Sequence, residues 1–168
     1  MWVPCSGREE LDGLIWLPRL VQKARRFSQG RARGEDLMNG YLYGNNDPGD
    51  RALLDFLRTD DTTVLQVLEA HPLDEHAARE LIERGGRTLE ERRRFSASLR
   101  RKFFNFTLLE ADEGRMPAGL RRTLLQGFYN RILMPPFYLW FRYAERRRRR
   151  RNAQSPQAGS AASRKPSA

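Results

Sequence analysis

Basic and acidic side chains occur at spacings that could hold an anionic ligand or form a salt-bridge network. Arg19 and Lys23 are four residues apart, so an α-helix places them on the same face. Asp50 and Asp55 lie in a later helical segment, from which they could pair with these cations across a bundle. The cations and the end of their helix could instead bind an anion. We predict a structural network; the alternative is a small anionic-ligand site, or a small enzyme built on this cluster.

Other residues that carry out chemistry in proteins show no suitable spacing. His71 and His76 have Pro72 between them, so they do not share a helix face, and no cysteine lies near them. Cys5 is the only cysteine, and no glycine-rich phosphate loop or nucleophile elbow occurs. We therefore predict no catalytic residue, no metal ligand and no cofactor, and we favour a non-enzymatic protein.

Four stretches of the chain form a recognisable pattern, namely Leu14–Arg19, Lys23–Arg25, Tyr41–Gly44 and Asp50–Leu57. Together they resemble an uncharacterised bacterial family filed as a domain of unknown function, DUF5069. The resemblance extends over Leu11–Arg94 and more loosely to Ile132, and its Leu-Pro-Arg and Lys-Ala-Arg elements are the most specific part. It implies a small, cytosolic, largely helical protein and supplies no activity.

The resemblance also implies which polar residues belong to the family's motif. These are Arg19, Lys23, Arg25, Tyr41 and Asp50. Together with Asp55 they form the candidate ligand-binding set, although the resemblance gives none of them a role. The aromatic segment and the arginine run at the end of the chain depart from the family pattern and are interpreted as an extension.

Local patterns predict that helices position these residues. Apolar residues from Leu17 to Phe27 repeat at helical spacing, and Pro18 suits the first turn of that helix. Asp47–Gly49 has the composition of a turn, and a helix is expected to follow it through Leu53–Leu57. Further helices are expected to begin at Thr59 or Asp60, at Asp74 and at the capping box Thr88–Glu91.

The later helices are expected to pack on the same core. The helix after the capping box carries an apolar stripe of Phe95, Leu99, Phe103, Phe106 and Leu109. Another helix is predicted to start at Pro117, with inward-facing Leu120, Leu124, Phe128 and Ile132, and Phe137–Ala144 is predicted to form a final aromatic-rich turn or helix. Because no alternating strand pattern occurs, the sequence predicts an all-α fold, a small irregular helical bundle with a disordered basic C-terminal tail.

Charge is unevenly distributed along the 168 residues, whose net charge is +10. From Arg142 onward, nine arginine and lysine residues face one acidic residue, Glu145, so this end carries +8. The residues after Asn152 are mostly Ser, Ala, Gln, Pro and Gly, a composition that buries too little surface to become ordered. We predict a loose N-terminus over residues 1–10, a helical domain over 11–144 and an arginine-rich disordered tail over 145–168.

The basic end could contact a polyanion. Aromatic residues at 137–143 lead directly into an arginine run, a combination suited to the headgroup level of an anionic membrane. The same arginines could bind nucleic-acid phosphates without sequence preference. There are two alternatives to polyanion binding. The aromatic rings could pack in the core, and the arginine tail could be solvated without a specific partner. The residues predicted to make polyanion contacts are Trp140, Arg146, Arg147, Arg148, Arg149, Arg150 and Arg151, with a membrane surface slightly ahead of nucleic acid.

The apolar segments are too short to predict a transmembrane helix. The longest run, Ile132–Phe141, is about half of the roughly 20 residues that a spanning helix needs, and it contains two prolines. The N-terminus has no basic segment followed by an apolar run, so no secretory signal is predicted. We expect a cytoplasmic protein. Its tail could attach it peripherally to a membrane.

Overall fold

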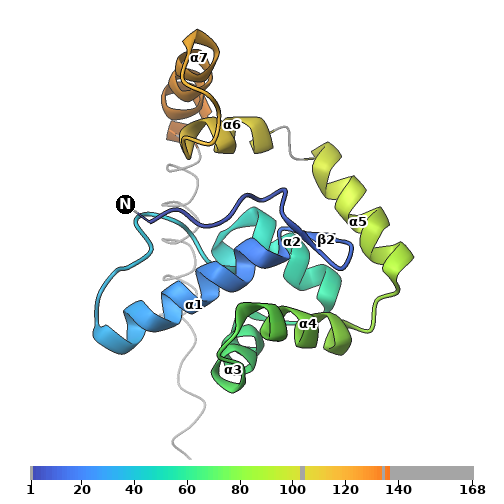
Figure 1. Cartoon of the computed structure of the whole chain (residues 1–168). Helices are drawn as coiled ribbons and strands as arrows, with labels where there is room; N and C mark the ends of the chain where they lie inside the picture. Colours follow the sequence, from blue (N-terminus) through green and yellow to red (C-terminus); the bar gives the residue numbers. More distant parts are fainter. Residues whose placement is uncertain (1, 103–104, 134, 137–168) are drawn as a thin grey trace, which may run out of the picture. The chain divides into compact units, whose positions relative to one another are not determined.

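The computed structural model describes residues 2–102, 105–133 and 135–136, which form two units, 1–115 and 116–168 (Figure 1). Apart from one two-stranded hairpin, the regular elements of these residues are helices, so the predicted all-α bundle is confirmed. The predicted tail over 145–168 lies outside the described residues.

The first unit contains the hairpin and six α-helices. The hairpin pairs β1 (Glu10–Leu11) with β2 (Leu14–Ile15) in antiparallel register. The helices are α1 (Leu17–Arg33), α2 (Pro48–Leu57), α3 (Asp61–Ala70), α4 (Asp74–Gly85), α5 (Leu89–Lys102) and α6 (Asn105–Asp112). A short 3-10 turn, Gly44–Asn46, precedes α2. The second unit contains α7 (Leu120–Phe128), which continues into a π-helix, Tyr129–Leu133.

Polar side chains cap three helices near the predicted positions. The Asp47 carboxylate accepts hydrogen bonds from the amides of Gly49 and Asp50 and so begins α2. The Asp60 carboxylate accepts the amide of Thr63 at the start of α3. At the start of α5, the Glu91 amide donates to Thr88 Oγ1 at 3.2 Å, and the Thr88 amide donates to Glu91 Oε2 at 2.8 Å. This last pair confirms the predicted capping box.

The core of the first unit forms around α1. This helix packs against α3 and α4, and α2 packs against α4 (Figure 1). The predicted stripe of α1 is buried at Leu17, Leu20, Val21 and Ala24, whereas Phe27 is 37% exposed. The other elements contribute Leu14, Ile15, Leu53, Leu54, Leu57, Val64, Val67, Ala77 and Leu81 to the same core.

The hairpin was not predicted because each strand has only two residues, too few for an alternating pattern to appear. Its turn has positive φ at both Asp12 (48°) and Gly13 (87°). Ser96, in α5, fixes the hairpin from the other side. The Ile15 amide donates to Ser96 Oγ at 3.1 Å, and the same hydroxyl donates to the Gly13 carbonyl at 2.7 Å. One buried side chain thus joins the hairpin to α5.

The N-terminal segment, expected to be loose, packs against the first unit. Pro4, Cys5 and Gly7 are buried. The Cys5 amide donates to Gln22 Oε1 in α1 at 2.8 Å, and Arg115 donates to the Pro4 carbonyl. Its partners come from α1 and from the residues after α6. The composition of a segment does not indicate hydrogen bonds to residues so distant in the sequence.

The apolar residues of α7 that were predicted to face inward are exposed. Leu120, Leu124, Phe128 and Ile132 are exposed by 75%, 64%, 41% and 58%. Helical periodicity locates an apolar face, but it does not show what covers that face. The predicted long helix after the capping box is represented by two elements, α5 and α6, in which Leu99 and Phe106 are buried as expected. Phe103 and the segment Phe137–Ala144 lie outside the described residues.

Replacing Ser96 by Ala should lower the free energy of unfolding by about 1–3 kcal/mol, because the buried Ile15 amide and the Gly13 carbonyl would lose their partner. Urea denaturation followed by circular dichroism measures this change. Ser98→Ala, two residues along the same helix, is the matched control and should change stability far less. Equal effects of the two substitutions would contradict the role given to Ser96.

Candidate functional site

Lys23 is fully buried and neutralised by two carboxylates at the start of α2. Its side chain is 0% exposed, and Nζ lies 2.7 Å from Asp50 Oδ1 and 2.8 Å from Asp47 Oδ2. Asp50 is also 0% exposed, whereas Asp47 is 19% exposed. A buried ammonium requires such pairing, because an unpaired charge in a protein interior is strongly unfavourable.

The Asp50 carboxylate has partners in α1, in the residue that precedes α1 and in the 3-10 turn. Oδ1 accepts from Trp16 Nε1–H at 2.8 Å as well as from Lys23, and Oδ2 accepts from the Gly44 amide at 2.9 Å. The carboxylate therefore joins the start of α1, the 3-10 turn and α2. Its hydrogen bonds fix the orientation of the Trp16 ring.

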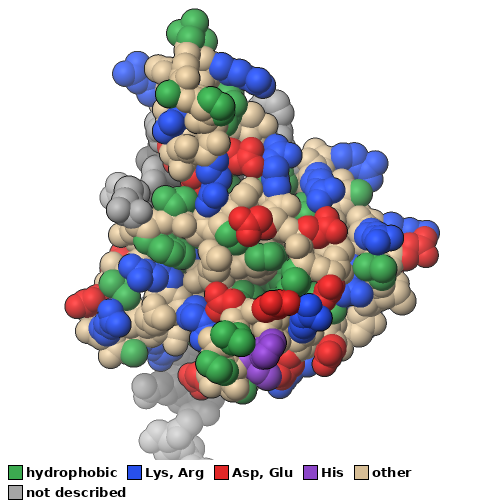
Figure 2. Space-filling view, in the orientation of Figure 1, with side chains coloured by type: hydrophobic (Ala, Val, Ile, Leu, Met, Phe, Trp, Pro, Cys, Tyr) green, Lys and Arg blue, Asp and Glu red, His purple; other side chains and the backbone are tan. Residues whose placement is uncertain are grey.

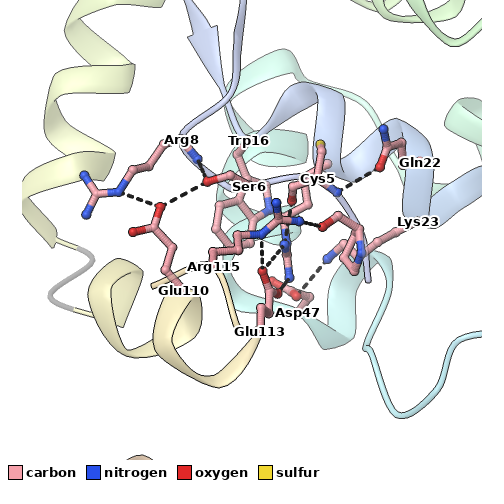
Figure 3. Close-up of polar contacts among 12 residues, drawn as sticks. Cys5, Ser6, Arg8, Trp16, Gln22, Lys23, Asp47, Glu110, Glu113 and Arg115 are labelled. Carbon is pink, nitrogen blue, oxygen red and sulfur yellow. Dashed lines mark hydrogen bonds and ion pairs between the residues drawn. The ribbon is translucent and has the colours of Figure 1, made fainter. Parts of the chain in front are cut away.

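Arg19, one turn before Lys23, forms a second buried ion pair. Its two terminal nitrogens meet both carboxylate oxygens of Glu113, one of them at 3.2 Å. Nη1 also donates to the Cys5 carbonyl at 2.7 Å, and Arg115 Nε lies 3.1 Å from Glu113 Oε2 (Figure 3). The side chains of Arg19 and Glu113 are only 2% and 1% exposed. This cluster connects the N-terminal segment, α1 and the residues after α6.

Aromatic rings cover the two cations. The Arg19 guanidinium carbon lies 5.3 Å from the centre of the Trp16 ring and 5.4 Å from that of Tyr41, and Lys23 Nζ lies 5.6 Å from Trp16. Such contacts stabilise desolvated cations. Trp16 therefore contributes in two ways, through its indole N–H to Asp50 and through its face to Arg19 and Lys23.

Two glycines allow the backbone to approach Trp16 closely. A Cβ at Gly7 or at Gly49 would lie 2.4 Å from atoms of the indole ring. A Cβ at Gly7 would also lie 2.7 Å from the Phe106 ring, which meets Trp16 edge to face. Only residues without a side chain fit at these two positions. Trp16 itself has a φ of 71°, a left-handed conformation that is unusual for a bulky residue.

Burial shifts the pKa of three groups around this cluster upward. Burial, assisted by the neighbouring Asp47 carboxylate, raises the pKa of Asp50 to about 6 against the opposing effect of Lys23. Burial and then Glu113 raise the pKa of Tyr41 to about 12. Burial and then Glu9 raise the pKa of Cys5 to about 12, so its sulfur is a thiol at neutral pH and a poor nucleophile.

Direct contacts link four of the six candidate ligand-binding residues. Lys23 pairs with Asp50, Arg19 and Lys23 both lie over the Trp16 ring, and the Tyr41 ring packs on Arg19. Arg25 lies elsewhere: it pairs with Asp74 and donates to the His71 carbonyl, which connects α1 to the start of α4. The side chain of Asp55 is exposed on α2.

Two carboxylates of this cluster are not among the candidate ligand-binding residues. Asp47, expected in the turn before α2, caps that helix with one oxygen and binds Lys23 with the other. Glu113 follows α6 and pairs with Arg19, which lies 94 residues away. The turn composition at Asp47 indicates the cap and not the contact with Lys23, and no local pattern indicates the partner of Glu113.

The chemical capacity of this cluster is limited by its internal pairing. Lys23 faces two carboxylates, and both terminal nitrogens of Arg19 face another. Within the described residues, no group of three or more His, Cys, Asp or Glu side chains could hold a metal ion. These contacts are those expected of a structural network, and they leave little cationic character for an anionic ligand.

The residues predicted to contact a polyanion, Trp140 and Arg146–Arg151, lie outside the described residues. The described part of the second unit contributes three further arginines to the basic end of the chain. These are Arg121, Arg122 and Arg131. Within the described residues, no helix has both the length and the apolarity that a membrane span requires.

Comparison with known proteins identifies one family. The family model described as "Domain of unknown function (DUF5069)" matches residues 2–105, which confirms the resemblance seen in the sequence. No curated protein and no solved structure matches the chain. The matched residues include α1–α5 and the Lys23–Asp50 pair, whereas Glu113 and the second unit lie beyond them.

Replacing Lys23 by Met should lower the free energy of unfolding by about 3–5 kcal/mol, because Asp50 would keep its buried charge without the cation. The double variant Lys23→Met/Asp50→Leu should recover part of this loss. Arg79→Ala, which breaks an exposed pair with Glu75, is the control and should cost at most about 1 kcal/mol. Chemical denaturation measures all three, and a Lys23→Met effect as small as the control would contradict the pairing.

The raised pKa of Asp50 predicts a pH dependence of stability. Between its ordinary value of 3.8 and about 6, the folded protein holds a proton that the unfolded chain has released. The contribution of Asp50 to the free energy of unfolding should therefore fall as pH rises through 6, by at most about 1.4 kcal/mol per pH unit. Denaturation of the native chain and Asp50→Asn at pH 4–7 tests this. The stability difference in favour of the native chain should narrow with rising pH, and a widening difference would contradict the prediction.

Proposed function

We propose that this chain, which belongs to the DUF5069 family, is a non-enzymatic interaction domain that contacts a polyanion through its basic C-terminal part. An anionic membrane surface is the favoured polyanion, ahead of nucleic acid. The observation that carries this proposal is the distribution of charge between the two units.

The excess positive charge belongs entirely to the second unit. Residues 116–168 contain 12 arginine and lysine residues and one acidic residue, Glu145, which gives +11. Residues 1–115 contain 19 basic and 20 acidic residues, which gives −1. An excess of cationic residues attracts a polyanion over a distance of about one Debye length. We therefore expect the electrostatic attraction to arise from the second unit alone.

The charges of the first unit are largely neutralised within it. Its buried cations, Arg19 and Lys23, are paired with carboxylates, and further pairs such as Arg79–Glu75 and Arg94–Glu90 lie on its surface. Figure 2 shows acidic and basic side chains interspersed on the face in view. The face in view has no extended patch of one sign on the first unit, which supports a role for this unit as a folded carrier.

The order of residues in the basic end favours a membrane surface. Five aromatic residues between 137 and 143 directly precede the six consecutive arginines, Arg146–Arg151. Aromatic side chains suit the boundary between headgroups and acyl chains, and each nearby arginine adds about 1 kcal/mol of attraction to an anionic leaflet. Double-stranded DNA would bind the arginines through its phosphates and would leave most of the aromatic residues without a partner.

Truncation after Glu145 should reduce binding to phosphatidylserine-containing vesicles by at least about 100-fold, because it removes eight cationic residues. Truncation after Arg151 is the matched control: it removes only Arg164 and Lys165 and should retain most of the binding. Co-sedimentation at about 0.1 M salt measures both, and binding should weaken as salt increases.

A parallel titration with double-stranded DNA separates the two polyanions. Binding to vesicles that exceeds binding to DNA at the same salt concentration supports the membrane surface. DNA binding without vesicle binding would replace the membrane by nucleic acid. If the full-length chain binds neither, the proposed function is wrong.

A further inference from the structure

The second unit exposes a continuous apolar stripe along α7 and the π-helix. Leu120, Leu124, Phe128 and Ile132 follow one another at intervals of four residues, a spacing that places side chains on one side of a helix. Their exposed fractions run from 41% to 75%. Among the described residues of the first unit, the large exposed apolar side chains instead lie singly in different segments, at Phe27, Leu42, Leu73 and Leu89. The stripe is therefore a distinct surface feature.

Arginines accompany this stripe, and no acidic residue occurs between positions 116 and 136. Arg121 and Arg122 lie in α7, and Arg131 lies in the π-helix. Figure 2 shows hydrophobic and basic side chains next to one another over α7. Long arginine side chains can keep the guanidinium at a polar layer while their methylene groups lie along an apolar surface.

We infer that α7 is an interfacial membrane-binding helix. It lies in the plane of an anionic bilayer, with Leu120, Leu124, Phe128 and Ile132 at the boundary between headgroups and acyl chains and with its arginines on lipid phosphates. The inference rests on the proposed function and deepens it, because it adds insertion of named side chains to electrostatic attraction by the tail.

Charge and chemistry favour a bilayer over other occupants of the stripe. A second copy of this unit would bring another +11 against the same surface and would be repelled. A nucleic-acid backbone offers phosphates but no apolar layer for four exposed side chains. An anionic bilayer supplies phosphates for the arginines and an apolar layer for the stripe, and an amphipathic helix that lies in the interface contacts both.

Substitution of the stripe should weaken vesicle binding. Leu120→Gln/Leu124→Gln retains helix propensity and charge while removing apolar surface, and it should reduce partitioning onto phosphatidylserine vesicles by at least about 10-fold. The control, Leu42→Gln/Leu73→Gln, changes two comparably exposed leucines of the first unit and should leave partitioning unchanged. Equal binding of the two double variants would overturn the inference.

A fluorescent label reports insertion directly. In a Cys5→Ser background, an environment-sensitive fluorophore is attached at Leu124→Cys or at Gln126→Cys, which lies two residues further and therefore on the opposite side of α7. Emission from position 124 should shift to shorter wavelength on vesicles, and emission from 126 should shift much less. Thermal unfolding of each variant confirms that the folded unit is retained.

The outcomes separate the inference from the proposed function. Persistent vesicle binding with no spectral shift at either label overturns insertion by α7 and leaves electrostatic binding by the tail intact. A lower melting temperature of Leu120→Gln/Leu124→Gln with unchanged vesicle binding shows that the stripe packs against protein, which also overturns the inference. Failure of the full-length chain to bind vesicles overturns both.

Discussion

The folded unit depends on the neutralisation of one buried ammonium. Lys23 is completely enclosed in the first unit, and an enclosed cation is tolerated only where carboxylates and hydrogen bonds replace water. Asp50 meets this requirement, and its remaining hydrogen bonds fix Trp16 and Gly44. The need to pair Lys23 therefore fixes the conformation of three segments: the start of α1, the 3-10 turn and the start of α2. The glycines beside Trp16 are needed because the ring that covers the cation leaves no room for side chains.

The Arg19–Glu113 pair is a second buried ion pair that must be kept together, and it connects the two ends of the first unit. It lies one helical turn from Lys23 and holds the N-terminal segment through the Cys5 carbonyl. Buried ion pairs contribute specificity more reliably than stability, because desolvation offsets most of their attraction. We interpret the two pairs as devices that select one arrangement of α1, α2 and the segment after α6. This interpretation also explains why the motif residues need not bind a ligand.

The two units divide the properties of the chain. The first unit holds the residues matched by the family model, together with the buried Lys23–Asp50 and Arg19–Glu113 ion pairs and a net charge near zero. The second unit lies beyond the matched region and holds the excess charge and the exposed apolar stripe. A neutral folded carrier joined to a cationic, amphipathic segment is an arrangement suited to attachment at a surface.

The sequence by itself determined the features that depend on neighbours within four residues. The caps at Asp60 and Thr88–Glu91, the buried face of α1 and the proximity of Arg19 to Lys23 all follow from helical geometry, and the charge asymmetry follows from composition. Only the tertiary structure decided which distant groups meet. It paired Glu113 with Arg19, packed the N-terminal segment onto α1 and left the stripe of α7 exposed. The physical reason is that periodicity fixes the direction of a side chain relative to its own helix, whereas burial and charge pairing depend on what the rest of the chain places there.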